Sequence, residues 1–408
     1  MPEDDFDAAE ENGDPADARD LFKWLSREVR ELMPREVPVL EAPPTALAFS
    51  RDYVAANRPC VVRGAVDHWP ARELWTASYL SAALGDTPVS VNVTPTGLGD
   101  ALLSTEGFDV TFRGERPPGA SDEASPPKPP VVFVQPEARR MPFRAFRALV
   151  RASSRENERA PRASRTIAYV SAQNDSFAAE YAPRLGADLG GDAALGFDWA
   201  RDAFGAPPDA VNLWCGLGDA VTSFHRDHYE NVYVVLRGRK TFTLLPPCDA
   251  WRMEPIEAPS ARFEYSRTET RPSASNATCR VVVETPVSNV SWPSATPTSL
   301  RRDGGPPAFV VTVRAGETLY LPAMWYHHVS QGAGEGERDG PRRDPEDEDA
   351  SDDSAFAIAV NFWHDMRFDD RFATARFLDV ARERARRRES HEGASRRSRT
   401  SELYEQCQ

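Results

Sequence analysis

The segment from Asp209 to Pro247 constrains the fold of this chain more than any other. It holds two strand-like apolar runs, VYVVL and KTFTLL, on either side of a turn at Gly238. Similar short runs lie before and after it, at Ala46–Phe49, Pro59–Arg63, Pro88–Val93, Val131–Val134, Arg165–Val170 and Phe356–Trp363. Many short strands with few helices predict a mainly β fold with flanking helices, built as a barrel or a jelly roll.

Composition permits a sizeable core and excludes several classes of protein. Of the 408 residues 40% are hydrophobic, yet no apolar run approaches the roughly 20 residues that span a bilayer, so no membrane association is expected. The formal charge of −14 argues against a nucleic-acid binder. The N-terminus shows no signal peptide and the five cysteines form no CxxC pair. We therefore expect an intracellular protein, cytoplasmic or also nuclear.

Charge and hydrophobic periodicity divide the chain into successive segments. Leu21, Leu25 and Val29 recur at helical spacing, whereas the first fifteen residues carry seven acids and no base. We expect an acidic disordered tail at 1–16, an N-terminal helix and linker at 17–42, a β domain at 43–366 with loop insertions near 113–130, 255–307 and 332–354, a C-terminal helix at 367–390, and a tail at 391–408.

The central segment carries the first candidate site residues. His225 and Asp227 are separated by a single residue. Because residues i and i+2 of a strand share a face, the imidazole and the carboxylate are expected to project into the same space. His228 has the opposite parity and is predicted to point away from Asp227.

Lys240 is the second notable residue of this segment. The chain has three lysines and otherwise uses arginine as its basic residue, so a lysine inside a strand-like run invites a specific explanation. Lys240 shares its predicted face with Phe242 and Leu244. If these two side chains point inward, the ammonium group is also buried and needs an anionic partner.

A second run, VRAGETLYLPAMWYHHV at Val313–Val329, supplies two adjacent histidines, His327 and His328. It reads as a strand, a bend marked by proline, and another strand. Adjacent strand residues face opposite ways, so only one of the two can reach the same interior as His225. The spacing alone does not decide which one.

Two histidines and one carboxylate predict a facial triad for Fe(II), which leaves coordination positions open for oxygen chemistry. Such a site retains a net charge near +1, which suits an anionic chelating cosubstrate. Lys240 then has a natural partner in a distal carboxylate of that molecule. A dicarboxylate with a keto-acid head is 2-oxoglutarate, with O2 as the second cosubstrate.

Structural explanations compete with each of these hypotheses. The two-residue spacing of His225 and Asp227 arises readily by chance, and Lys240 could protect a sheet edge from aggregation. The joint arrangement in this order is more specific than its parts. The remaining histidines, His68, His228, His364 and His391, are assigned to packing or to the solvated surface.

Beyond these residues, the chain resembles the JmjC-domain 2-oxoglutarate oxygenases, and among them the small JmjC lysyl hydroxylases, to which peptidase activity is also attributed. The resemblance extends from about Pro43 to Leu378. It implies a double-stranded β-helix, the cupin-like jelly roll, for residues 43–366. It is carried by the central segment and by four further motifs: RPCVVRGAVDHWPA, VNVTPTG, VRAGETLYLPAMWYHHV and AVNFWHDM.

The resemblance also assigns roles to individual residues. It implies that His225, Asp227 and His327 bind the metal, which favours the first histidine of the adjacent pair. It implies that Lys240 and Tyr169 bind the distal carboxylate of 2-oxoglutarate. Three more residues fall at positions that related enzymes use around the same cosubstrate: Thr222, Asn231 and Asn361.

The activity implied by the resemblance is hydroxylation of a protein side chain, lysine at C3, in developmentally regulated GTP-binding proteins. A homodimer formed through the C-terminal helix is also implied. Two alternatives stay open at this stage: a JmjC lysine demethylase, and a non-catalytic cupin-like binding protein. A protease is disfavoured because the sequence shows no convincing nucleophile–base arrangement.

Overall fold

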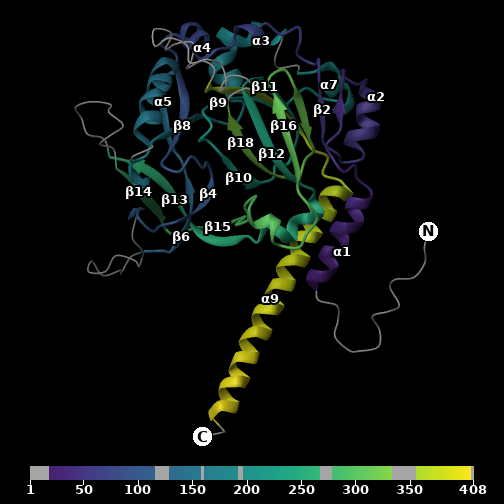
Figure 1. The fold of residues 1–408 in the computed structure, drawn as a ribbon, viewed down its shortest axis with the longest axis vertical. Helices are drawn as coiled ribbons and strands as arrows, with labels where there is room; N and C mark the ends of the chain where they lie inside the picture. The colour runs from purple at the N-terminus through teal and green to yellow at the C-terminus, as the bar shows by residue number, and fades with distance from the viewer. Residues whose placement is uncertain are drawn as a thin grey trace, which may run out of the picture.

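The computed structural model describes residues 18–114, 128–157, 160–191, 196–266, 278–332 and 355–405, and its architecture is mostly β-sheet with helices packed outside (Figure 1). Two sheets of nine and four strands face each other to form a jelly roll, and a third sheet of six strands adjoins them. The predicted fold class is confirmed.

The larger sheet of the jelly roll has nine strands. Their spatial order is β1 (Val39–Leu40), β2 (Cys60–Val62), β17 (Thr318–Leu321), β11 (Tyr229–Arg237), β19 (Ala357–Asp365), β9 (Ala210–Gly216), β8 (Ile167–Val170), β3 (Pro88–Thr94) and β7 (Glu137–Pro142). The last strand of the chain, β19, therefore lies in the middle of the sheet, with β11 and β9 as antiparallel neighbours.

The opposing sheet has four antiparallel strands, in the order β10 (Thr222–His225), β18 (Tyr326–Gly332), β12 (Arg239–Leu245) and β16 (Phe309–Arg314). A buried apolar cluster fills the space between the two sheets. It joins Tyr233 and Val235 of β11 to Phe242 and Leu244 of β12. The inward face predicted for β12 is confirmed.

The turn at Gly238 connects β11 to β12, one strand of each sheet. Its φ of +68° is a conformation that side chains rarely adopt, and a Cβ atom there would lie 2.7 Å from the carbonyl oxygen of Gly332. Glycine is therefore required both by the backbone conformation and by the close approach of a neighbouring strand.

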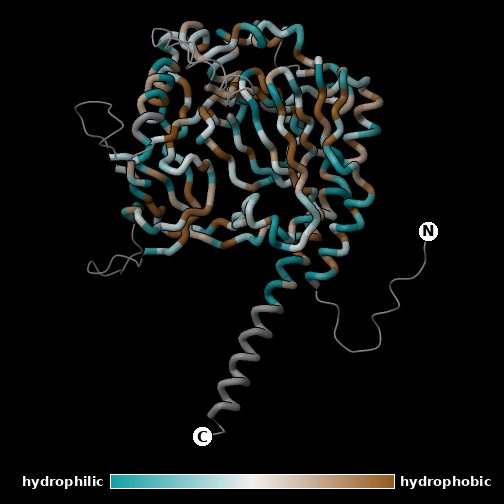
Figure 2. The backbone as a smooth tube through the Cα atoms, viewed as in Figure 1, coloured by the Kyte–Doolittle hydropathy of each residue, from teal (hydrophilic) through white to brown (hydrophobic). Residues whose placement is uncertain are grey.

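The outer face of the nine-stranded sheet is covered by short helices. Val232 and Val234, which alternate with the inward residues of β11, belong to a second and larger core together with Leu80 and Phe146 from two of these helices. Figure 2 shows hydrophobic residues along the central strands. The helices are α2 (Ala46–Phe49), α3 (Ala71–Leu74), α4 (Ala77–Leu84), α5 (Phe143–Asn157), α6 (Ala182–Leu185) and α7 (Asp198–Phe204).

Two expectations about the strands are wrong. Residues 46–49 are helical because Thr45 caps them: its hydroxyl accepts a hydrogen bond from the backbone N–H of Ala48. The segment 255–307 is not a loop insertion, since it contributes three strands to the third sheet. Its polar composition is explained in part by β13, which buries alternate residues such as Phe263 and Tyr265.

The third sheet follows the order β4 (Ala101–Ser104), β6 (Val131–Gln135), β13 (Ile256–Tyr265), β14 (Cys279–Thr285) and β5 (Asp109–Gly114), and β15 (Asn289–Trp292) pairs with β13. The expected tail at 1–16, the insertion at 332–354 from residue 333 onward, and residues 115–127 of the insertion at 113–130 lie outside the described residues.

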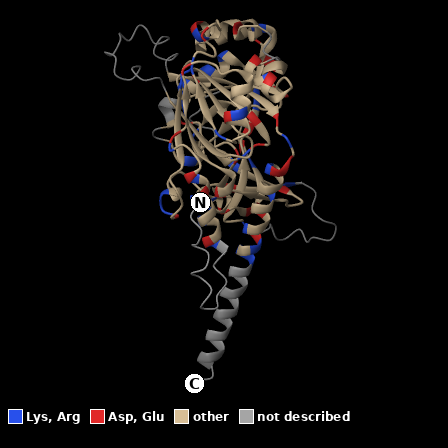
Figure 3. Cartoon of the chain, turned by 90° about the vertical axis from the view of Figure 1, so that its right-hand side faces the viewer, with Lys and Arg blue, Asp and Glu red and all other residues tan. Residues whose placement is uncertain are grey.

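Two helices pack together beside the four-stranded sheet, α1 (Ala18–Glu31) and α9 (Asp370–Glu405) (Figure 1). Both contact the 3₁₀ helix η7 (Pro247–Met253), where Phe22, Trp251 and Leu378 form a buried cluster. The helix α9 continues past residue 390, where the sequence predicted its end, through the segment expected to be a tail. Basic and acidic residues are interspersed over the outside of the described chain (Figure 3).

Candidate metal centre

Three potential metal ligands converge at one end of the jelly roll. His225 ends β10, Asp227 follows it, and His327 lies directly opposite His225 in the antiparallel pairing of β10 with β18. The Nε2 atoms of His225 and His327 lie 3.8 and 3.6 Å from Oδ2 of Asp227. One ligand atom from each residue lies within 4.8 Å of the others. The strand register therefore creates the convergence.

Both imidazoles are held by their other ring nitrogen. Nδ1 of His225 lies 2.9 Å from the carbonyl oxygen of Ser223, and Nδ1 of His327 lies 3.0 Å from that of Trp325. A carbonyl can only accept, so each Nδ1 carries a proton and each Nε2 faces Asp227, where it can bind a metal. Backbone contacts of this kind orient histidines that bind metals.

The electrostatic surroundings keep His327 neutral. Burial, reinforced by the adjacent imidazole of His225, lowers the pKa of His327 to about 4, although the carboxylate of Asp227 opposes the shift. Two neutral imidazoles and one carboxylate on one side of a cavity form the donor set of a 2-His-1-carboxylate site. The residues present therefore fit a divalent metal such as Fe(II).

The remaining described histidines lie away from this cluster. His328 packs against Phe224, with ring centroids 5.5 Å apart. His228 contacts Phe368 and Phe372 of the α9 region, opposite in direction to Asp227. His364 donates from Nδ1 to the carbonyl oxygen of Ala206, and His68 lies beside Trp69. The side chain of His391 is outside the described part of the structure.

Lys240 lies farther along the same inward face and is 1% exposed. Its Nζ donates to the hydroxyl of Tyr169 and to Oε1 of Gln331, each at 2.6 Å. Burial lowers the pKa of Lys240 to about 7. No carboxylate in the described ranges forms an ion pair with this ammonium group, so its protein partners are neutral oxygens.

Gln331 was not identified from the sequence, although a signal existed. Residues 327, 329 and 331 alternate along β18, so Gln331 shares the face of His327. The register places Gln331 directly opposite Lys240, and His327 opposite Leu244. A glycine accommodates this contact: a Cβ atom at Gly216 would lie 2.6 Å from Tyr169 and 3.1 Å from Gln331.

The other predicted cosubstrate residues line the same cavity. Thr222, Asn231 and Asn361 border it together with the three potential ligands and Tyr169. Nδ2 of Asn361 donates to Oδ1 of Asn231 at 3.2 Å, while its Oδ1 accepts from Nε1 of Trp214 at 2.8 Å. These bonds fix the orientation of both amides. Trp214, Gln173 and Trp363 also line the cavity and were not predicted.

Comparison with known proteins bears on the whole of this arrangement. The family model of the cupin-like domain matches residues 46–370. The chain belongs to the JmjC oxygenase family. The family expected from the central segment and its four accompanying motifs is therefore confirmed.

The names of two similar proteins refer to three activities, those of a demethylase, a peptidase and a lysyl hydroxylase. "Lysine-specific demethylase JMJ32" of Arabidopsis thaliana is 37% identical over 368 residues, covering 87% of this chain and 89% of that protein. "Bifunctional peptidase and (3S)-lysyl hydroxylase JMJD7" of Homo sapiens is 35% identical over 356 residues, covering 86% and 91%. "JmjC domain-containing protein E" of Dictyostelium discoideum is 31% identical over 370 residues, covering 88% and 92%.

Among the described residues, no helix combines the length and the apolar character needed to cross a membrane. Four cysteines, Cys60, Cys215, Cys248 and Cys279, are buried and free.

Proposed function

We propose that this JmjC protein is an Fe(II)- and 2-oxoglutarate-dependent lysyl hydroxylase that acts at C3 of a lysine in a GTP-binding protein. The observation that carries the proposal is the cavity lined by the His225–Asp227–His327 cluster and by Tyr169, whose hydroxyl accepts a hydrogen bond from the buried ammonium group of Lys240. The names of two relatives, which refer to lysine, support the residue type acted upon.

The two ends of the chamber would bind different groups, the metal at one end and the distal carboxylate of 2-oxoglutarate at the other. His225, Asp227 and His327 would hold ferrous iron. When bound, the metal and 2-oxoglutarate together supply the oxidising chemistry, in which one oxygen atom of O2 enters a C–H bond and the cosubstrate becomes succinate and CO2. The protein binds, orients and shields these reactants.

Lys240 and Tyr169 would receive the distal carboxylate of 2-oxoglutarate. Burial lowers the pKa of Lys240, and a carboxylate at this position would raise it again and so keep the ammonium group charged. Asn231, Asn361 and Thr222 would contact the rest of the cosubstrate from the walls of the cavity.

A separate cavity of about 640 Å³, lined by residues that include Asp100, Glu137 and Glu264, supports a cationic substrate. It is lined by Asp100, whose carbonyl oxygen accepts a hydrogen bond from Ser223, two residues before His225. The indole N–H of Trp292 donates to the same hydroxyl, and the indole ring lies parallel to the imidazole of His225. Asp100 is thus joined through its backbone to the strand that carries His225.

The charges of this cavity leave one carboxylate without a protein partner. Glu264 pairs with Arg113, and Glu137 pairs with Arg139. The carboxylate of Asp100 forms no hydrogen bond or ion pair with any described residue. Burial raises the pKa of Asp100, and the nearby imidazole of His225 opposes the rise. An ammonium group of the substrate would stabilise its charged form.

Mass spectrometry tests this proposal directly. Purified protein with Fe(II), 2-oxoglutarate and lysine-containing peptides from developmentally regulated GTP-binding proteins should yield a product heavier by one oxygen atom. Succinate should form in equal amount. A metal-loaded protein that neither modifies these peptides nor consumes 2-oxoglutarate contradicts the proposal and favours a non-catalytic binding protein.

Demethylation is the second candidate, because the Arabidopsis relative is named a lysine-specific demethylase. It would use the same chamber and the same cosubstrate. Formaldehyde released from a methyl-lysine peptide, without an oxygenated product from the unmethylated peptide, would establish it in place of hydroxylation.

We also propose a cytoplasmic or nuclear location and a homodimer formed through α9. The buried free cysteines support a reducing compartment. Phe377 and Val380 of α9 are 68% and 43% exposed, which supports an apolar contact between two copies. Light scattering of the protein and of Phe377→Glu should give a dimer and a monomer, respectively.

A further inference from the structure

The segment that carries two of the metal ligands alternates between two environments. His225 and Asp227 face the metal centre, whereas Arg226 and His228 face the opposite way, toward α9 and the residues just before it. The helix α9 therefore contacts the ligand segment from behind, through the residues that lie between and after the ligands.

Arg226 makes the central contact. Its Nη2 donates to Oδ2 of Asp379 on α9, and the two side chains are only 15% and 12% exposed. Its guanidinium carbon also lies 4.9 Å from the ring centroid of Tyr326, the residue before His327. One arginine thus connects α9 to both strands that supply ligands.

The neighbouring backbone is fixed from the same side. The N–H of Met366 donates to the carbonyl oxygen of His228, and the N–H of Met324 donates to that of Asp227. Met324 and Met366 in turn belong to a buried cluster with Ala375 of α9. The first turns of α9 therefore pack against the turn that follows Asp227.

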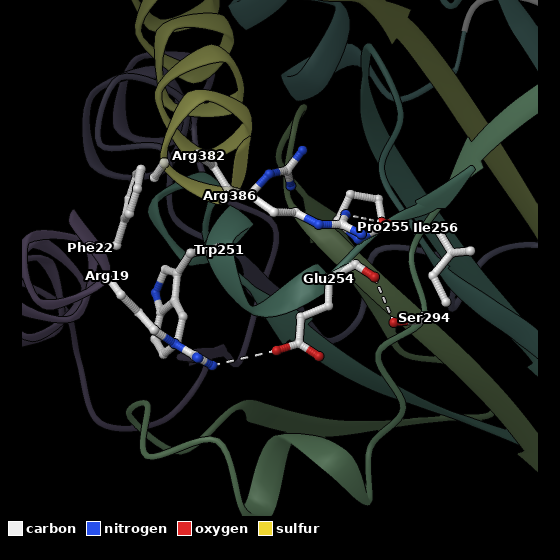
Figure 4. Close-up of a pocket in the computed structure, with 10 residues that line it drawn as sticks. Arg19, Phe22, Trp251, Glu254, Pro255, Ile256, Ser294, Arg382 and Arg386 are labelled. Carbon is white, nitrogen blue, oxygen red and sulfur yellow. Dashed lines mark hydrogen bonds and ion pairs between the residues drawn. The ribbon is translucent and has the colours of Figure 1, made fainter. Parts of the chain in front are cut away.

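The helix α9 has other anchors besides Arg226, of which Arg382 also forms an ion pair with Asp379 and Arg386 does not. Arg382 donates to the carbonyl oxygen of Ala250 at 2.9 Å, and Arg386 to that of Pro255 at 2.5 Å. Figure 4 shows both arginines beside Trp251, at a cavity of about 370 Å³ between α1, α9 and η7. These contacts would keep the helix docked if the ion pair with Arg226 were lost.

We propose that Asp379 is a positioning residue of the metal centre, which fixes the His225–Asp227 segment through its ion pair with Arg226. The inference rests on the proposed metal site. It concerns a residue 152 positions beyond Asp227 in the sequence, on a helix that contributes no ligand. Groups that hydrogen-bond a metal ligand directly change metal affinity by about 10- to 100-fold, and we expect Asp379, which acts through Arg226, at the lower end of that range.

The experiment compares two isosteric substitutions on α9. Asp379→Asn removes the charge that binds Arg226, whereas the matched control Glu383→Gln removes an acid of an exposed pair with Arg387. Mn(II) replaces Fe(II), and the free ion is followed by electron paramagnetic resonance. Asp379→Asn should raise the Kd for Mn(II) at least about tenfold, and Glu383→Gln should leave it unchanged. Thermal unfolding of both metal-free variants reports separately on the stability of the fold.

A double-substitution cycle keeps the proposal falsifiable if Asp379→Asn destabilises the fold. If both residues act through their contact, Arg226→Gln combined with Asp379→Asn should weaken Mn(II) binding no more than the worse single change. The proposal would be overturned if the two substitutions reduced the free energy of Mn(II) binding additively. It would also be overturned if Asp379→Asn bound Mn(II) with the Kd of the wild type. A wild type that binds no Mn(II) would instead refute the metal site and the proposed function with it.

Discussion

The two ends of the chamber solve different physical problems. At the metal end, the ligands lie at the end of β10 and just beyond it, and the carboxylate of Asp227 keeps 25% of its side-chain surface exposed. At the other end, Lys240 lies inside β12 and is enclosed by strands on both sides. The metal site is accessible, and backbone carbonyls orient its imidazoles. The site around Lys240 is buried, and burial disfavours the charge of its ammonium group.

The contrast shows how one sheet can separate metal binding from cosubstrate binding. The same inward face of β18 supplies His327 to one end and Gln331 to the other. A substitution at one end should therefore weaken the binding of either the metal or the cosubstrate and leave the other unchanged.

The largest effect is expected for Asp227→Ala. Removing the only carboxylate of the cluster should lower Mn(II) affinity more than about 100-fold, because loss of a ligand exceeds the loss of its supporting contacts. Titration of Mn(II) provides the measurement. Retained metal affinity would show that the three residues do not form the site.

Lys240→Ala should affect the other end of the chamber. Loss of a buried charge partner costs roughly 3 kcal/mol, so the KM for 2-oxoglutarate should rise about 100-fold. Mn(II) affinity should stay that of the wild type. Lys240→Arg should not restore the KM, since a planar fork does not match the position of the ammonium group between Tyr169 and Gln331.

Asp100→Asn should weaken binding of the lysine substrate without affecting the metal site or the site around Lys240. We expect the KM for a lysine peptide to rise about tenfold, because a charge-assisted hydrogen bond becomes a neutral one. Peptide-independent consumption of 2-oxoglutarate should remain unchanged. If Asp100→Asn weakened the binding of a peptide with norleucine in place of lysine by the same factor, Asp100 would not contact the ammonium group.

The smallest effect concerns pH. With a pKa of about 7, Lys240 in the free protein loses its proton as the pH rises, so affinity for 2-oxoglutarate should fall about fivefold between pH 7 and pH 8. Tyr169, Tyr233 and Cys215 face this group and stay neutral there, because burial raises their pKa values. Calorimetric binding at several pH values checks this, and Lys240→Ala should show no such slope.

The same shift has a consequence for stability. The unfolded chain binds a proton at this lysine up to about pH 10.5, whereas the folded protein releases it near pH 7. Between these values the unfolded state binds more protons, so the contribution of Lys240 to the free energy of unfolding rises with pH.

Residue parity was sufficient to predict much of the site. The inward direction of His225 and Lys240 follows from a period of two along a strand, whereas Asp227 lies beyond the end of β10 and shares the direction of His225. The choice between His327 and His328 needed more, since it depends on which residue of β18 lies opposite β10. That register is a tertiary property and has no local signal.

The contacts that were missed join distant parts of the sequence. Asp379 and Arg226 are 153 residues apart, and neither lies in a pattern that indicates the other. The strands of 255–307 were missed because a sheet with one solvated face tolerates many polar residues. At 46–49, a run of four residues is too short for its period to distinguish a strand from one helical turn.

The central position of β19 bears on how the protein is made. Its partners β9 and β11 are synthesised well over a hundred residues earlier, and each keeps an unpaired edge until β19 arrives between them. On the ribosome the nine-stranded sheet would therefore remain split until nearly the whole domain has emerged. A nascent chain truncated before residue 357 would expose two hydrophobic strand edges, the kind of surface that chaperones protect.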